Sequence, residues 1–389
     1  MQIGIIESFF LIFAGAAVLA TLALFARQPL IVAYIIVGCV FGPNALGWVA
    51  DPVLLSEIAQ IGIIFLLFLV GLDLPPSKLK NMLGSSVLTA LGSSAVFFAA
   101  GFGVLTAFGY PLEAAVVAGI AAMFSSTIMG LKLLPTTVLH HRHIGEVVVS
   151  LLLIQDLIAI LSLLVLAGYG AGPGGMLESL LVVMVALPLL VAVAFVGVRF
   201  FVIPLIRRFD AFHEFIFLLA IGWCLAVATL GHAADLSLEI GAFIAGVSLA
   251  NAPIAQYITE SLRPLRDFFL ILFFFSVGAA IDPVLLLEVI APTLLLAGVL
   301  IGLKPIVFRA LLHWQGESQP VAWEVGFRLG QASEFSLLVT YVAGSVALLD
   351  DATAHVIQGA TVITLLLSTY LVIFRYPSPI AVSARLRRD

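Results

Sequence analysis

The chain has 389 residues, of which 62% are hydrophobic and only 10% are charged, and its mean hydropathy is +1.23. Soluble domains have about 45–50% apolar and about 25% charged residues. This composition, with long apolar runs along the whole chain, predicts an all-α polytopic membrane protein. It excludes a soluble enzyme and a secreted disulfide scaffold, and a net charge of -5 without a basic tract excludes a nucleic-acid binder. Cys39 and Cys224 lie inside apolar stretches and are interpreted as small hydrophobic residues.

The apolar segments predict thirteen transmembrane helices. The first run lacks a positively charged leader and is long enough to span a bilayer, so no cleavable signal peptide is indicated. The approximate limits of the segments are 3–25, 29–49, 55–72, 84–108, 112–134, 145–167, 177–205, 213–231, 236–252, 266–281, 285–309, 321–346 and 352–374. No separate soluble domain is evident, so residues 1–389 are expected to form one transmembrane domain.

The basic residues predict the orientation. If the N-terminus lies outside, the inner loops and the C-terminal tail hold or adjoin fifteen of the 17 basic residues, and Lys304 and Arg328 lie within spans. The outer loops instead carry acidic residues. Because positive residues favour the cytoplasmic side, we expect a multi-pass protein of the cytoplasmic membrane with its N-terminus outside and its C-terminus inside.

Thirteen spans also permit an inverted repeat, with residues of about 1–167 matched to about 213–374 and a linker helix at about 177–205. Transporters with such repeats bind their substrate near the midplane, where two helices are broken. The fifth and twelfth spans contain segments with weak helical propensity, at residues 123–130 and 330–336. These segments are the candidate broken helices.

Asp156 lies almost at the middle of the sixth span, beside Gln155. A carboxylate at this depth costs several kcal/mol, so it is a functional candidate by default. One interpretation is a hydrogen-bonding pair that joins helices. The favoured hypothesis is a carboxylate that takes up a proton or a cation in turn.

Other polar residues at mid-depth complete the candidate site. Ser125, Ser126 and Thr127 would loosen the fifth span and, with freed carbonyls, offer oxygen ligands to K⁺ or Na⁺. Glu334 in the twelfth span needs a cation on another helix or a proton. Lys304 is interpreted either as snorkelling to the inner interface or as the countercharge of Asp156 or Glu334.

Three further patterns suggest simpler interpretations. Glu324 and Arg328 have the spacing of an ordinary intrahelical ion pair. The Gly-rich string at 170–175 follows a membrane helix instead of a strand, so it predicts a flexible connector and not a dinucleotide site. The histidines at 140, 141 and 143 favour a solvated inner loop over a metal cluster.

These residues resemble the membrane domain of the monovalent cation:proton antiporter-2 family, in particular its Kef-type potassium/proton branch. The matching segments are 65–74, 125–127, 155–156, 241–246, 273–278, 304–305 and 331–335. The resemblance implies thirteen helices with crossed broken helices, a dimerisation domain, and an essential ion-binding aspartate at the position of Asp156. Members with two adjacent acids at this point are electrogenic sodium/proton exchangers. Gln155 departs from that pattern and favours the electroneutral potassium branch.

The sequence therefore predicts a K⁺/H⁺ antiporter core that works by alternating access as a homodimer in the lipid bilayer, without a cofactor. Asp156 would bind H⁺ or the cation. Ser125, Ser126 and Thr127 would complete the cation shell, and Gln155 would orient it. Lys304 and Glu334 would hold the crossing region together. A Na⁺/H⁺ antiporter of the same architecture is the nearest alternative, and a channel-like leak is a second. No segment such as T-V-G-Y-G is present, which favours a transporter. Kef-type proteins usually continue into a cytosolic nucleotide-binding regulatory domain. This chain stops at Asp389, just beyond the last predicted span, and the resemblance leaves open whether that domain was removed or is absent from this member.

Overall fold

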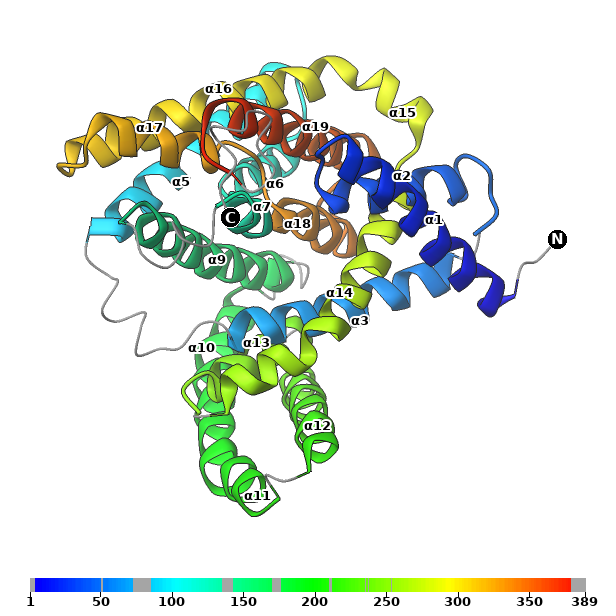
Figure 1. Ribbon diagram of the computed structural model, residues 1–389, viewed down its shortest axis with the longest axis vertical. Helices are drawn as coiled ribbons and strands as arrows, with labels where there is room; N and C mark the ends of the chain where they lie inside the picture. The colour runs from blue at the N-terminus through cyan, green and yellow to red at the C-terminus, as the bar shows by residue number, and fades with distance from the viewer. Residues whose placement is uncertain are drawn as a thin grey trace. The chain divides into compact units, whose positions relative to one another are not determined.

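The computed structural model describes residues 4–49, 52–72, 85–134, 143–169, 176–209, 212–234, 236, 238–252 and 254–378 (Figure 1). Nearly all of them lie in helices, as the composition predicted. The predictions made for His140 and His141 and for the Gly-rich string at 170–175 lie outside the described residues. The chain divides into two compact units, residues 1–50, 83–166 and 277–389, and residues 51–82 and 167–276.

The first unit contains most of the helices with buried polar residues. In chain order its helices are α1 (Ile5–Phe25), α2 (Leu30–Phe41), α5 (Ser85–Ala107), α6 (Leu112–Ala122), α7 (Thr127–Lys132), α9 (His143–Tyr169), α15 (Pro283–Glu288), α16 (Ile290–Trp314), α17 (Gln319–Arg328), α18 (Glu334–Ser345) and α19 (Asp351–Arg375). Helix α6 packs against α5 and α18, and α16 packs against α5, α17 and α19. The candidate site residues therefore all belong to this unit.

The second unit contains α3 (Pro52–Leu72), α10 (Met176–Gly197), the π-helix η1 (Val198–Val202), α11 (Ile203–Arg208), α12 (His213–Ala233), α13 (Leu238–Leu249) and most of α14 (Ala255–Ala280). Helices α3 and α13 approach very closely, because glycines replace side chains at their contact. A Cβ atom at Gly246 would collide with the carbonyl oxygen of Phe68. Small residues at helix contacts are typical of membrane proteins, where backbones gain packing energy by approaching closely.

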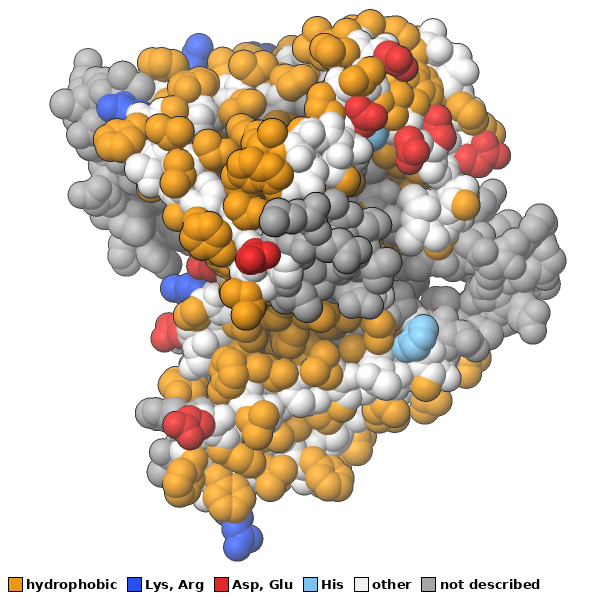
Figure 2. Space-filling model, turned by 90° about the vertical axis from the view of Figure 1, so that its right-hand side faces the viewer, with side chains coloured by type: hydrophobic (Ala, Val, Ile, Leu, Met, Phe, Trp, Pro, Cys, Tyr) orange, Lys and Arg blue, Asp and Glu red, His pale blue; other side chains and the backbone are white. Residues whose placement is uncertain are grey.

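The surface matches a membrane environment. Seven of the described helices are long and apolar enough to cross a membrane, and four shorter apolar helices accompany them. Large hydrophobic side chains such as Phe10 and Leu218 are 67% exposed. Figure 2 shows hydrophobic side chains over most of the described surface in that view. A water-soluble protein rarely exposes such an area, so the structure is that of a multi-pass membrane protein.

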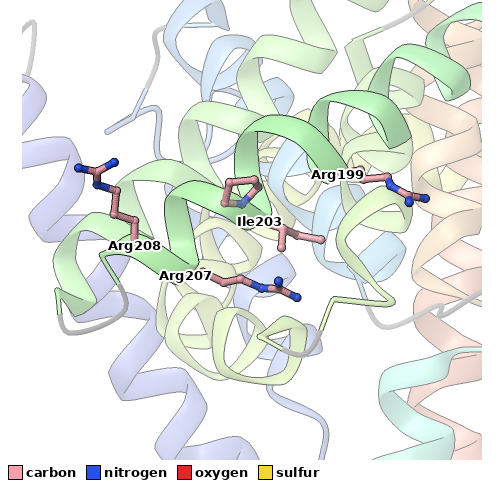
Figure 3. A pocket seen from close by; sticks show the side chains of 5 residues that line it. Arg199, Ile203, Arg207 and Arg208 are labelled. Carbon is pink, nitrogen blue, oxygen red and sulfur yellow. The ribbon is translucent and has the colours of Figure 1, made fainter.

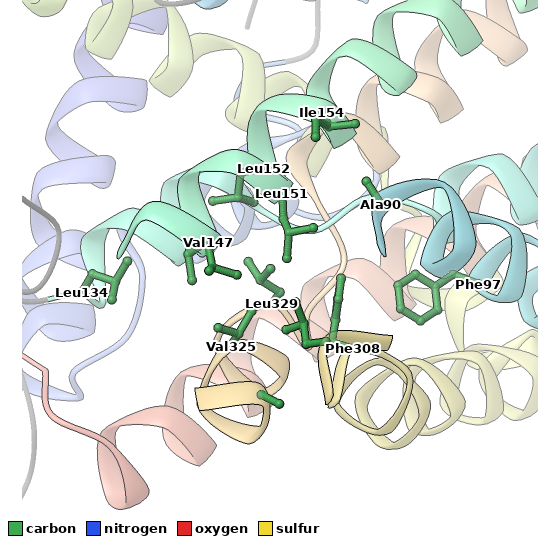
Figure 4. Packing of buried hydrophobic residues seen from close by; sticks show 13 residues of the cluster. Ala90, Phe97, Leu134, Val147, Leu151, Leu152, Ile154, Phe308, Val325 and Leu329 are labelled. Carbon is green, nitrogen blue, oxygen red and sulfur yellow. The ribbon is translucent and has the colours of Figure 1, made fainter. Parts of the chain in front are cut away.

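A buried hydrophobic cluster lies beside the candidate site (Figure 4). It joins α5, α9, α16 and α17 through side chains that include Phe97, Leu151, Phe308 and Leu329. The rings of Phe97 and Phe308 pack edge to face, with their centroids 5.4 Å apart. Because buried side chains interlock, this cluster fixes α9 and α16, which carry Asp156 and Lys304, against the start of the second helix break.

Candidate functional site

The helix is interrupted at both segments for which the sequence predicted it. Residues 123–126 separate α6 from α7, and residues 329–333 separate α17 from α18. Serines restart the helix in both cases. The Ser126 hydroxyl accepts a hydrogen bond from the Met129 amide, and the Ser333 hydroxyl accepts one from the Phe335 amide. Serine is a preferred N-cap because its oxygen satisfies an amide that the first helical turn leaves unpaired.

Lys304 connects the two breaks. Its ammonium Nζ donates to the carbonyl oxygen of Phe124 in the first break at 2.5 Å and to that of Gln331 in the second at 3.0 Å. The side chain is fully buried, and Nζ lies 5.0 Å from the centroid of the Phe97 ring. It therefore does not snorkel to an interface, and its hydrogen-bond partners are carbonyls and not a carboxylate. A carbonyl released by a helix break is one of the few acceptors available at this depth.

Asp156 faces the start of α7. The Thr127 hydroxyl lies 3.0 and 3.1 Å from the two carboxylate oxygens of Asp156, and Asp156 is 4% exposed. Thr127 is the first residue of α7, where unpaired amides favour negative charge. A carboxylate and a hydroxyl at a helix break offer hard oxygen ligands of the kind that an alkali cation prefers.

Gln155 supports the first break from the neighbouring position on α9. Its amide oxygen accepts from the Ser125 amide at 3.2 Å, and its nitrogen lies 3.5 Å from the Met123 carbonyl oxygen. Gln155 is fully buried. Its amide group therefore acts on both a donor and an acceptor of the broken backbone, which a carboxylate, having no donor, could not do.

Ser125 and Ser126 are placed differently from Thr127. The Ser125 hydroxyl donates to the Leu329 carbonyl oxygen at 2.8 Å and so joins the two breaks, while Ser126 caps α7. The structure thus brings Thr127 and Asp156 together and engages the other two hydroxyls in holding the backbone. Sequence proximity alone could not separate these roles.

The second break is held by hydroxyls of α19 and α18. The Thr364 hydroxyl accepts from the Ala332 amide at 3.0 Å, and Ser368 donates to the side-chain oxygen of Gln331 at 2.8 Å. Ser336 donates to the Ala121 carbonyl oxygen at 2.6 Å and ties α18 to the end of α6. Thr364, Ser368 and Ser336 are functional candidates that the sequence analysis missed. The recurrence of Thr and Ser along α19 was the available signal.

Glu334 opens α18 and is 6% exposed. Its carboxylate interacts electrostatically with that of Asp156. Two like charges in a poorly hydrated site repel each other, so a proton or cation bound at one of them relieves this repulsion.

Arg328 forms the ion pair that the sequence predicted, with 2.7 Å between its Nη2 atom and the Glu324 carboxylate. The same guanidinium donates to the carbonyl oxygens of Leu133, just after α7, and Pro377, after α19. Arg328 is fully buried. It therefore anchors the ends of three helices, which the helical spacing did not indicate.

Comparison with known proteins identifies the family of this chain. Residues 11–373 match the family model for the transmembrane part of sodium/hydrogen exchangers. The chain belongs to the sodium/hydrogen exchanger family. It is 29% identical over 361 residues to K(+) efflux antiporter 4 of Arabidopsis thaliana, an alignment that covers 89% of this chain and 60% of that protein. The chain thus spans about 60% of the length of this relative. Membership of the family confirms the resemblance seen in the sequence.

The chain is also similar to a second transporter in sequence and to an antiporter in fold. The chain is 26% identical over 344 residues to the iron transporter MagA of Paramagnetospirillum magneticum, covering 88% of this chain and 79% of that protein. Its fold is that of the sodium proton antiporter MjNhaP1 of Methanocaldococcus jannaschii, with a TM-score of 0.72 and 16% identity, covering 98% of this chain and 97% of that one. At this identity the similarity concerns the fold.

Proposed function

We propose that the chain exchanges a monovalent cation, K⁺, for H⁺ across the cytoplasmic membrane by alternating access. The observation that carries the proposal is the buried Asp156 carboxylate at the Thr127 hydroxyl, beside a helix break. H⁺ and the cation compete for this one carboxylate. In the loaded forms the charge of Asp156 is neutralised and the site can cross, whereas the empty form, in which Asp156 is charged, cannot, because moving an uncompensated charge through hydrocarbon is expensive.

The donor set supports an alkali cation. Thr127 and Asp156 are hard oxygen donors, which suit such an ion, whereas imidazole and thiolate ligands suit iron better. The name of the Arabidopsis relative supports K⁺. Gln155 in place of a second acid supports exchange of one proton for one cation.

The proposal includes the finer architecture that the sequence predicted. It comprises thirteen spans with the N-terminus outside, two broken helices that cross, a homodimer, and regulation from the inner face by a cytosolic domain or subunit. Single cysteines introduced at Ser77, expected inside, and at Glu113, expected outside, test the topology with a membrane-impermeant label. Labelling of both positions from the same side would refute thirteen spans.

The decisive assay uses proteoliposomes that contain a pH-sensitive dye and are challenged with K⁺, Na⁺, Rb⁺ or Li⁺. We expect K⁺ and Rb⁺ to drive proton flux and Li⁺ to be ineffective. A response confined to Na⁺ and Li⁺ would support the sodium alternative. Cation flux without proton flux would refute antiport and support a leak.

Membrane potential tests the stoichiometry. Asp156 is the one acid of the Gln155–Asp156 pair, so we expect one proton to exchange for one cation. A potential set with a gradient of a permeant anion such as thiocyanate should then change the rate little. Gln155→Asp adds a second acid that can carry another proton. Its exchange should depend on voltage, because one charge moved through 100 mV corresponds to about 2.3 kcal/mol. Equal voltage dependence of both proteins would contradict this role of Gln155.

A further inference from the structure

The ion-exchange proposal leaves several features of the described residues without a role. One is a groove of about 640 Å³ on η1 and α11 in the second unit, lined by Arg199, Ile203, Pro204, Arg207 and Arg208 (Figure 3). Another is His355, which is 6% exposed on α19 in the first unit. Helix α19 also carries Thr364 and Ser368, which hold the second break. Of the two features, His355 is therefore the one whose helix leads to the ion site.

The backbone holds both ring nitrogens of His355. The Asp282 amide nitrogen lies 2.7 Å from Nε2, and Nδ1 lies 2.6 Å from the carbonyl oxygen of Asp351, one turn earlier on α19. An amide N–H only donates and a carbonyl only accepts, so Nδ1 carries the proton and Nε2 accepts the hydrogen bond. The ring is therefore neutral in this arrangement. A second proton, on Nε2, would break the hydrogen bond from Asp282.

This hydrogen bond joins α19 to the start of α15. Asp282 is the N-cap of α15, and its carboxylate accepts from the amides of Val284 and Leu285. In a capping box the amide of the N-cap residue is satisfied from within its own helix. Here the acceptor is His355 of another helix. We call this contact between the Asp282 amide and the His355 ring the histidine latch.

Helix α15 is short and poorly buried. It has six residues, none of which is buried, and Val284 and Leu287 are 67% and 69% exposed. Leu286 lies against α19 at Gly359, where a Cβ atom would come within 2.8 Å of its Cδ1 atom. Segments with little buried apolar surface open locally at low free-energy cost. The position of α15 therefore depends strongly on the latch.

Both helices that the latch joins lead to the ion site. Helix α15 ends at Glu288 and α16 begins at Ile290, so a shift of α15 is passed to the helix that carries Lys304 (Figure 1). Helix α19 bonds to the second break through Thr364 and Ser368. All these residues belong to the first unit. The latch thus joins the starts of two helices that hold the breaks.

Other titratable groups lie at the ends of the elements that pack against this part of α19. The acidic ones are Asp282, Glu288, Asp350, Asp351 and Glu113, the others are Tyr110, Tyr341 and Cys39, and residues 290–303 of α16 have none. Asp282 and Asp350 cap helices, and His355 has no ion pair among the described residues. These carboxylates offer an imidazolium partners that the neutral ring does not need. Histidine is the side chain that ordinarily changes charge between about pH 5 and 8.

We propose that the histidine latch is a pH-sensitive switch, in which protonation of His355 releases the start of α15 from α19 and slows ion exchange. The released ring is positive and turns to a carboxylate such as that of Asp282. With α15 released, the start of α16 is held less firmly against α19, so Lys304 and the hydroxyls of α19 no longer keep the two breaks in a fixed arrangement. The latch goes beyond ion exchange and rests on the first unit alone, whereas its effect on transport rests on the proposed function.

Hydrogen–deuterium exchange of the full chain in detergent, corrected for the pH dependence of intrinsic amide exchange, tests the latch directly. In the wild type, the protection of residues 281–286 should fall about tenfold between about pH 8 and about pH 5, because a hydrogen bond is lost. His355→Gln keeps a neutral acceptor and should stay protected at both pH values, whereas His355→Ala should have low protection at both. His232→Gln removes an exposed histidine of α12 in the second unit and is the matched control, which should behave like the wild type. Equal protection of the wild type at both pH values would overturn the latch.

The effect on transport is measured as Rb⁺ entry into K⁺-loaded proteoliposomes with equal pH on both sides. Competition of H⁺ with the cation at Asp156 affects the wild type and His355→Gln alike, so the ratio of their rates isolates the latch. The His355→Gln rate should equal the wild-type rate at about pH 8 and exceed it at about pH 5. The same ratio at both pH values would overturn the effect on transport. Absence of exchange in every protein, with the pH-dependent protection intact, would overturn the proposed function but confirm the latch.

Discussion

The two helix breaks of the first unit share a backbone design but differ in their polar partners. Each ends in a serine N-cap, and each gives one carbonyl oxygen to Lys304. The first break then faces a carboxylate and an amide of α9, whereas the second is held by hydroxyls of α19. A broken helix in a membrane therefore does not by itself make an ion site. The side chains that neighbouring helices direct at it decide what it can do.

The substitution Asp156→Asn should have the largest effect, because it removes the titratable group of the first break. The asparagine keeps the shape and can still bond to Thr127, but it carries neither a charge nor an exchangeable proton. Coupled exchange in proteoliposomes should disappear, while the melting temperature should stay the same or rise, since a buried charge is no longer desolvated. Glu146→Gln, on the exposed part of the same helix, is the matched control and should transport normally. Robust pH-coupled cation flux by Asp156→Asn would refute the mechanism.

Lys304→Met should destabilise the protein by about 3 kcal/mol, because two charged hydrogen bonds are lost and two buried carbonyls remain unpaired. The loss is measured as the shift in the unfolding midpoint in detergent. Arg309→Met, which removes a cation from the same helix but at a partly buried position, should cost less. Lys304→Arg should keep part of the stability or transport. Unchanged melting and exchange in Lys304→Met would mean that the ammonium does not hold the breaks together.

The pair Thr127→Val and Thr127→Ser tests the hydroxyl that distinguishes the first break. Valine has nearly the same shape but cannot donate to Asp156, so we expect the apparent affinity for the transported cation to fall about tenfold, corresponding to one lost hydrogen bond to a charged group. Serine retains the hydroxyl and should stay near the wild-type value. The measurement is the cation concentration that gives half-maximal proton flux. Equal affinities of the two variants would remove Thr127 from the site.

Thr364→Val should have the smallest effect and a different kind of effect. It leaves the buried Ala332 amide without its acceptor, which costs about 1–2 kcal/mol of stability, but it should leave the cation affinity unchanged. Thr369→Val is the matched control, because Thr369 is also buried on α19 but, among the described residues, its hydroxyl bonds only to the Leu365 carbonyl of its own helix. A large change in cation affinity with Thr364→Val would show that the two breaks are functionally equivalent after all.

Local patterns predicted much of the site. Three consecutive hydroxyl residues at 125–127 and the Gly330–Ser336 segment indicated interruptions, because such residues compete with helical hydrogen bonding, and both interruptions are present. The spacing of Glu324 and Arg328 predicted their ion pair, which is confirmed. Asp156 was identified from its depth in the span alone, since a carboxylate inside an apolar run is costly and is therefore a functional candidate.

Long-range partners could not be predicted in this way. From the sequence, Lys304 was interpreted either as snorkelling to the inner interface or as the countercharge of Asp156 or Glu334. Its ammonium instead bonds to the carbonyls of Phe124 and Gln331, which are 180 and 27 residues away. Thr364 and Ser368 also lie more than thirty residues from the groups that they bind. Hydroxyls on a membrane helix often bond to their own backbone, so their sequence positions do not reveal which of them hold another segment.

By itself, the sequence determined the membrane environment, the helical class and the two weak helical segments, because hydropathy and backbone propensity act locally. Only the tertiary structure decided which polar group serves which break. In an apolar medium every released amide and carbonyl must find a partner, and the partner is whichever side chain the packing of distant helices brings within reach. For this reason Thr127 faces Asp156 while the adjacent Ser126 caps a helix.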